Sequence, residues 1–207
     1  MSHHVCSGLG TFKVSEVEHV HPVINRPGIA YVDIAEALEG RPYLKPADRE
    51  ILDRVFTLHR GILSMLFNFA QSGHPGGSIS VSRALIALFL TDRTAYDIGN
   101  PWRRDADIIS PAAGHKAMGW YALNALLHES VRQARPELLP ADPRNSLRLE
   151  DLLGFRKNEA VVTPLRKKFA SKCLDGHPTP ATPFTYLATG ASGVGVAATA
   201  GLAIAAR

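Results

Sequence analysis

Ser72–Ser78, with the sequence SGHPGGS, separates two apolar helical patterns and sets where one ends and the next begins. Glycine adopts backbone angles that are closed to other residues, and proline fixes φ and lacks a backbone donor. A turn of this composition allows a ligand to approach the main chain closely, and it holds the imidazole of His74 beside that ligand. We therefore interpret this turn as one wall of a candidate binding site.

Two helices are expected on either side of the turn. Apolar residues recur over 46–70 with the period of a broad helical stripe, and a proline at the first helical position suits the start. A second helix is expected over about 78–90, with Ser78 or Ser80 as its cap. Its apolar residues cover most of its circumference, which predicts deep burial.

The N-terminal residues show no sustained period. Glycine, histidine and proline punctuate residues 1–30, and a short helix is possible over Asp33–Leu38. We expect an irregular N-terminal arm over 1–45, followed by a domain over 46–207. A chain of 207 residues is long enough for one sizeable α/β domain or for part of a larger one.

One short apolar run predicts a strand. Asp107–Ser110 is followed by a glycine-containing loop and by a helical pattern over about 115–129. Strand, turn and helix N-terminus in this order are usual where a ligand binds at the carboxyl end of a sheet strand. Residues 186–188 are interpreted as a strand end, and residues 192–207 as a tightly packed, buried helix.

Charge and cysteine content narrow the class of protein. The net charge of +4 is mildly basic, and the basic clusters at 103–104 and 166–168 lack regular aromatic interleaving. Solvated faces therefore explain them better than a nucleic-acid surface, and a basic balance suits an anionic phosphate ligand. Cys6 and Cys173 form neither a disulfide framework nor a metal motif. With no leader and no apolar run of about 18 residues, we expect a cytoplasmic protein without membrane contact.

Three histidines each follow a glycine, at His74, His115 and His177. Imidazole shares protons near neutral pH and donates to phosphate or hydroxyl oxygens. Any one of them alone is more readily explained as an exposed or capping histidine. Zinc binding is a weaker alternative, because the three lack i, i+4 pairing and patterned carboxylates. Together, in glycine-bounded turns, they indicate a common site.

A glycine-rich stretch, Thr189–Gly195, opens the last apolar helix pattern. Its glycines permit close backbone approach, and a helix N-terminus offers free amides to a ligand. The same pattern fits a glycine-rich packing seam between helices equally well. The residues alone leave both interpretations open.

As an ordered set, these motifs resemble the N-terminal, diphosphate-binding part of transketolases, which are thiamine diphosphate enzymes. The resemblance covers about residues 47–207. Its motifs, in family order, are Ser72–Ser78, Asn100-Pro101-Trp102, Gly114-His115, Glu150–Leu153 with Phe155-Arg156, Asp175–Pro178, and Thr189–Gly195 with Gly201–Ala205.

The resemblance implies a three-layer helix–parallel sheet–helix fold, incomplete and helix-rich in this chain. It implies that His115 contacts the cofactor diphosphate, and that Gly190 and Ser192 meet the cofactor through their backbone. His74 and His177 would be the catalytic pair that lines the substrate channel and bonds the hydroxyls of sugar phosphates. The implied reaction is transfer of a two-carbon ketol unit between such sugars.

Three features depart from the family pattern. The loop Ser110–Ala113 before Gly114 is longer than usual, and so is the segment between His115 and His177. Ser192 and Val194 stand where leucine and glutamine are usual. These differences indicate a divergent branch.

The metal motif of the family, Gly-Asp-Gly followed by Asn, does not occur in these residues, so the chain itself supplies no predicted metal ligand. The Mg²⁺ (or Ca²⁺) that grips the diphosphate would be bound by a missing C-terminal part or a separate subunit, within a homodimer or hetero-oligomer. Two alternatives stay open. One is another enzyme of the superfamily, of the pyruvate dehydrogenase first-component or deoxyxylulose-phosphate synthase type. The other is a non-catalytic remnant that acts only in protein interaction.

Overall fold

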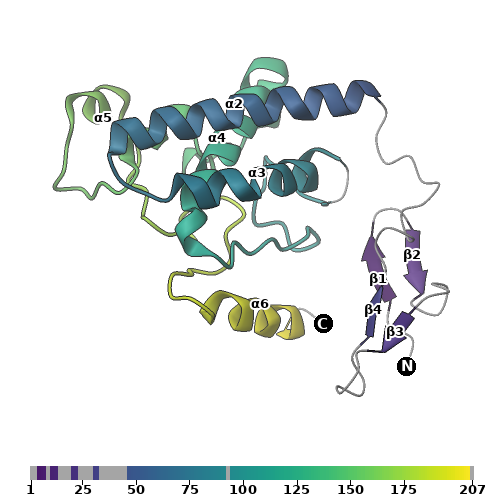
Figure 1. Cartoon of the computed structure of the whole chain (residues 1–207). Coiled ribbons are helices and arrows are strands. Elements are labelled where there is room, and N and C mark those ends of the chain that lie inside the picture. Colours follow the sequence, from purple (N-terminus) through teal and green to yellow (C-terminus); the bar gives the residue numbers. More distant parts are fainter. Residues whose placement is uncertain are drawn as a thin grey trace. The chain divides into compact units, whose positions relative to one another are not determined.

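The computed structural model describes residues 4–7, 10–13, 20–22, 30–32, 46–91 and 94–205 (Figure 1). The chain divides into two compact units, Met1–Ile51 and Leu52–Arg207. The boundary predicted at residues 45 and 46 stays a prediction.

The described residues of the first unit include two antiparallel strand pairs. β1 (His4–Ser7) pairs with β2 (Gly10–Lys13), and β3 (Val20–Pro22) pairs with β4 (Ala30–Val32). These strands lie in the segment where the sequence predicted an irregular arm. The short helix expected over Asp33–Leu38 lies outside the described residues.

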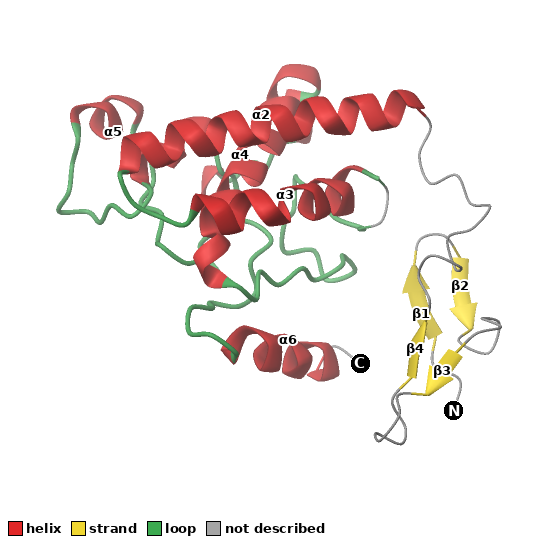
Figure 2. Cartoon of the chain, in the orientation of Figure 1, coloured by secondary structure: helices red, strands yellow, loops and turns green. Residues whose placement is uncertain are grey.

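The second unit is built from helices and loops (Figure 2). The long helix α2 begins in the first unit and ends within the second. The α-helices are α2 (Pro46–Ala70), α3 (Pro75–Leu90), α4 (Ala117–Ala134), α5 (Pro164–Phe169) and α6 (Val194–Ala205). The 3-10 turns are η2 (Gly114–Lys116), η3 (Pro136–Leu138), η4 (Pro143–Asn145) and η5 (Leu149–Gly154). The helix predicted over 46–70 is confirmed.

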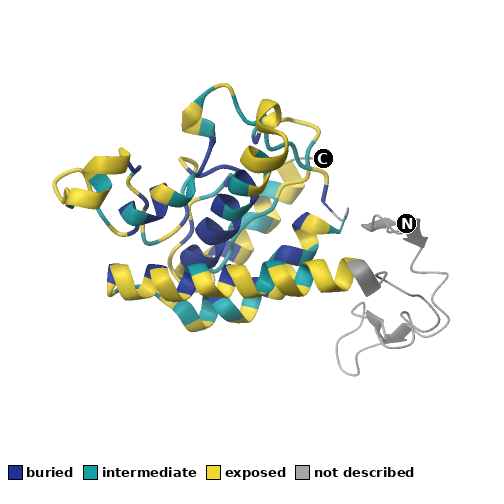
Figure 3. Cartoon of the chain, turned by 90° about the horizontal axis from the view of Figure 1, so that it is seen from above, coloured by how far each residue is buried: buried dark blue, intermediate teal, exposed yellow. Residues whose placement is uncertain are grey.

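Helix α4 forms the centre of the core. Most of its side chains between Ala117 and His128 are buried, including the large rings of Trp120 and Tyr121. Figure 3 shows the buried residues gathered in the middle of the helical unit, with exposed residues around them. Helices α2 and α3 pack against α4 with residues such as Leu63 and Ile86, which are almost fully buried.

Aromatic side chains close the core at the ends of α3 and α4. Phe89 lies 4.9 Å from Tyr96, 5.7 Å from Trp120 and 5.9 Å from Phe184, measured between ring centroids. The indole of Trp120 also donates to the Thr185 hydroxyl at 2.8 Å. Because Phe184 and Thr185 lie just before the glycine-rich stretch, these contacts hold that stretch against the core.

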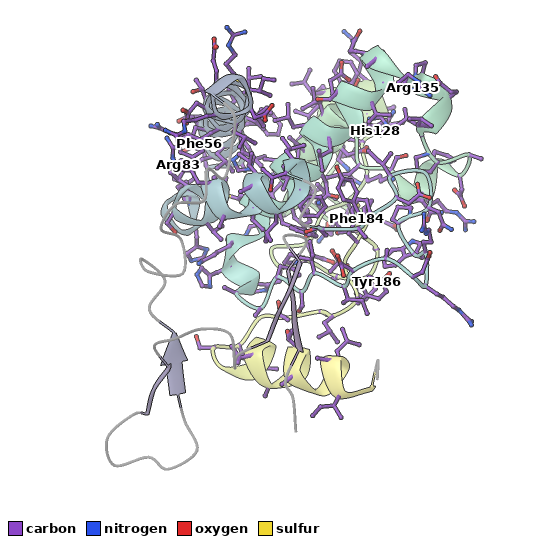
Figure 4. All side chains as sticks on the ribbon, turned by 90° about the vertical axis from the view of Figure 1, so that its right-hand side faces the viewer. Phe56, Arg83, His128, Arg135, Phe184 and Tyr186 are labelled. Carbon is purple, nitrogen blue, oxygen red and sulfur yellow. The ribbon has the colours of Figure 1, made fainter. Side chains whose placement is uncertain are left out.

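A charged pair joins α2 to α3 at the surface. The guanidinium of Arg83 lies 4.2 Å above the ring of Phe56 and donates to Asp53 at 2.7 Å. Figure 4 shows the labelled Phe56 and Arg83 beside each other on neighbouring helices. The pair is exposed, so it contributes little to stability and serves mainly to orient the two helices.

The predicted helix–parallel sheet–helix fold is wrong. Among the described residues, the strands are the short antiparallel pairs of the first unit, and none lies in the helical unit. Residues 107–110, expected to be a strand, are a loop whose Asp107 amide donates to Ala95 and whose Ser110 carbonyl accepts from Ala112. A strand needs a neighbour for its hydrogen-bond ladder, and this run bonds to turns instead. Residues 186–188 are also a loop.

Helix α6 is exposed rather than buried, contrary to the sequence prediction. Val196 and Ile204 are 71% and 72% exposed, and Gly195 is the one buried position described in this helix. α6 lies at the edge of the helical unit in Figure 1. Among the described residues, every helix is too short or too polar to traverse a lipid bilayer.

Candidate functional site

His74 is placed by the backbone of the turn between α2 and α3. Gly73 has φ of +119°, a conformation that residues with a side chain rarely adopt. A Cβ at Gly73 would overlap the Met118 sulfur and lie 3.1 Å from the ring of Phe155. His74 then occupies the N-cap of α3, with Pro75 as the first helical residue. The helix therefore begins three residues earlier than predicted, because proline is preorganised for that position.

His115 lies on the short turn η2, and its ring is beside that of His74. The two ring centroids are 5.8 Å apart and the rings meet edge to face at 72°. The first turn of α3 borders the same place, because a Cβ at Gly77 would lie 3.4 Å from both the His115 ring and the Lys116 side chain. The absent side chain lets η2 pack close to the N-terminus of α3.

The ring of His177 lies beside Gly114, the first residue of η2. A Cβ at Gly114 would overlap the carbonyl oxygen of Thr189 and lie 2.9 Å from the His177 ring. A Cβ at Gly190 would lie 3.5 Å from the same ring. The hydroxyl of buried Tyr121 is within hydrogen-bond distance of two carbonyls of this turn, those of Asp175 at 3.0 Å and His177 at 3.2 Å.

The three histidines predicted to share a site are therefore brought together around Gly114-His115. We call His74, His115 and His177 the histidine cluster. All three side chains are exposed, so each is open to a ligand from solvent.

The glycine-rich stretch contributes both packing and an open segment. The Thr189 hydroxyl donates to the Pro111 carbonyl at 2.8 Å, and a Cβ at Gly195 would overlap the Ala112 carbonyl. These contacts match the packing interpretation of the stretch. Gly193 has φ of +88° and open space around it, and Ser192 is exposed. Gly190 touches the histidine cluster, whereas Ser192 has no described contact with it.

Arg156 belongs to the site, although the sequence reasoning gave it no role. Its guanidinium donates to the Ser72 hydroxyl at 2.7 Å and lies against Gly176, where a Cβ would be 2.9 Å from Nε. It therefore touches both turns that carry a Gly-His-Pro tripeptide. A single arginine in a loop has no sequence signal for a contact 84 positions away, so only the folded chain reveals it.

Two hollows lie near these turns. One, of about 460 Å³, is lined by Arg156, Lys157, Asp175 and Gly176 among others. A larger one, of about 680 Å³, is lined by residues that include Trp102, Arg144, Lys172 and Thr179. Cys173, a free and exposed thiol, borders both hollows, and its sulfur accepts a hydrogen bond from Arg166.

The donor set of the site suits a phosphate group. Imidazole nitrogens, the ammonium of Lys116 and the amides at the N-terminus of a 16-residue helix all favour an anionic oxygen. The residues described in the structure include no group of three or more His, Cys, Asp or Glu side chains that could hold a metal ion. A phosphate or diphosphate group would thus find hydrogen-bond donors at the histidine cluster.

No protein-family model matches this chain, and no curated protein matches its sequence.

Proposed function

We propose that the histidine cluster is part of the ligand site of a transketolase-like transferase, which passes a two-carbon ketol unit between sugar phosphates. One observation carries this proposal. Three glycine-preceded histidines, up to 103 positions apart by subtraction of 74 from 177, converge around Gly114-His115. A merely structural role would not require three exposed imidazoles around one short turn.

Each histidine would have a distinct task. His115, beside Lys116 and the first turn of α3, would bind the diphosphate of thiamine diphosphate, while Gly190 and Ser192 would meet the rest of the cofactor through their backbone groups. His74, which lies beside His115, and His177, which lies beside Gly114, would bind hydroxyls of the sugar and move protons to and from its oxygen atoms. Thiamine diphosphate, when bound, supplies the electron sink for cleavage of a carbon–carbon bond.

The remaining requirements would be met by an assembly. Mg²⁺ or Ca²⁺ would be held by another part of the protein or by a separate subunit, in a homodimer or hetero-oligomer. The exposed apolar residues of α6 are consistent with such a neighbour, because large exposed apolar patches usually mark interaction surfaces. We keep the cytoplasmic location as an expectation.

The test is a ligand titration in which the side-chain NMR signals of the histidines are the readout. Thiamine diphosphate with Mg²⁺ should move the His115 ring signal most, and ribose 5-phosphate should move those of His74 and His177. Buried His59 and His128 are internal controls, because each is at least nine-tenths buried. His115→Gln should weaken the response to thiamine diphosphate more than the response to ribose 5-phosphate.

A second candidate is a non-catalytic interaction role, which the exposure of α6 also favours. The same titration separates the two candidates. If neither ligand moves any signal of the histidine cluster while the protein stays folded, the transferase proposal is wrong for this chain. The interaction role then remains.

A further inference from the structure

Two turns with the same Gly-His-Pro sequence carry His74 and His177 of the histidine cluster, and a single side chain touches both. Ser72–Pro75 leads into α3, and Asp175–Pro178 follows the loop after α5. The Arg156 guanidinium donates to Ser72, two positions before His74, and lies against Gly176, one position before His177. The two histidines are thus connected through one cation.

The backbone that carries Arg156 is held in place. Its φ of +53° is in the left-handed region, which a residue with a side chain adopts only when its surroundings require it. The Arg156 amide donates to the Leu174 carbonyl at 2.7 Å, and the Leu174 amide donates to Gly154 at 3.0 Å. Phe155, which precedes Arg156 in the chain, is 2% exposed. The side chain therefore projects from a rigid base.

Both turns need glycine for their contacts with Phe155 and Arg156. A Cβ at Gly176 would lie 2.9 Å from Nε of Arg156 and 3.4 Å from Nη2. A Cβ at Gly73 would lie 3.1 Å from the Phe155 ring. The Phe155-Arg156 pair thus contacts the glycine of each tripeptide, Phe155 at one turn and Arg156 at the other.

We propose that Arg156 is a positioning residue that sets the spacing of His74 and His177 for a shared ligand. This inference rests on the proposed function for the identity of that ligand, but the mechanical connection itself does not. A planar guanidinium suits this task, because its several N–H groups lie in one rigid plane that can bond to Ser72 while lying on Gly176. A lysine would bring the same charge without that geometry.

The experiment asks whether a change in one turn reaches the histidine of the other, without any ligand. The readout is the side-chain NMR signals of His74 and His177 in the full 207-residue chain. Ser72→Ala removes the hydroxyl that accepts from Arg156, so it should shift the His177 signal. Gly176→Ala pushes against the guanidinium, so it should shift the His74 signal.

Arg156→Gln supplies the decisive comparison. In an Arg156→Gln background, Ser72→Ala should no longer shift the His177 signal, and Gly176→Ala should no longer shift the His74 signal. Arg156→Lys should lose the transmission as well, because charge alone does not connect the turns. Arg132→Gln is the matched control, since Arg132 is exposed on α4 and bonds to Glu129; it should leave the transmission intact.

Two results would overturn the proposal. One is a cross-turn shift that persists without Arg156, and the other is the absence of any cross-turn shift in the parent background. Ser72→Ala keeps the test decisive if Gly176→Ala does not fold. Failure of the ligand titration with an intact cross-turn effect would instead reject the proposed function and retain the positioning role.

Discussion

The Nδ1 atom of His59 and the hydroxyl oxygen of Ser82 lie 3.0 Å apart, and neither side chain has any exposed surface. The other ring nitrogen, Nε2, is 2.9 Å from the Gly119 carbonyl, which can only accept, so Nε2 carries the proton. One imidazole therefore connects α2, α3 and α4. These are the helices whose ends carry two of the three clustered histidines.

Ser82→Ala should lower the free energy of unfolding by about 1–2 kcal/mol, because it leaves Nδ1 of His59 without its hydroxyl partner in a buried place. Urea denaturation measures the change. Ser80→Ala is the matched control on the exposed side of the same helix and should change stability by less than about 0.5 kcal/mol. Equal effects of both substitutions would contradict this role for His59.

Acid should destabilise the protein through His59. Burial lowers the pKa of His59 below 6.5, although the bond to Gly119 opposes this. Below about pH 6.5 the unfolded chain binds a proton that the folded chain refuses, so stability is full above that pH and falls as the pH drops toward the folded pKa. Thermal unfolding between pH 7.5 and 5 should show this decline.

His59→Leu, which cannot titrate, should flatten that pH dependence without abolishing it. A residual slope is expected because burial also lowers the pKa of His128. An unchanged slope in His59→Leu would show that other groups cause the acid sensitivity.

Asp151→Asn should lower the free energy of unfolding by about 2–4 kcal/mol. Asp151 is fully buried, and it accepts from the Arg148 guanidinium at 2.9 Å and from the Lys172 amide at 3.1 Å. Burial alone would raise the pKa of Asp151, but these bonds together hold it below its usual value. Chemical denaturation at neutral pH tests this, with the partly exposed Asp142→Asn as the control. Similar losses in the two variants would refute the distinction.

Two glycine-to-alanine changes should have opposite signs. Gly61 lies in the middle of α2 with open space around it, so Gly61→Ala should stabilise the protein by about 0.5–1 kcal/mol. Gly73→Ala must fit a Cβ against Met118 at φ of +119°, so it should destabilise the protein by about 2–3 kcal/mol. Melting temperatures compare the two directly, and a gain in both would be incompatible with the described turn.

Helices α2 and α3 could be predicted, apart from the exact start of α3 at Pro75, because their signals are local. Apolar periodicity, a proline at the first helical position and a glycine-containing break all act within a few residues of one another. The prediction of a strand over 107–110 was wrong because a strand depends on more than local signals. The apolar run is a local signal, whereas a strand exists only if a distant segment pairs with it.

The sequence by itself determined that His74, His115 and His177 would each lie in a glycine-bounded turn, since glycine and proline set backbone angles locally. It also determined where α2 runs and that the turn after it would present an imidazole. Only the tertiary structure decided that the three histidines meet around Gly114, because packing without a Cβ between Gly114 and Thr189 brings distant loops into contact. It likewise decided that Arg156 joins the two Gly-His-Pro turns, a contact that depends on how the chain folds back rather than on neighbouring residues.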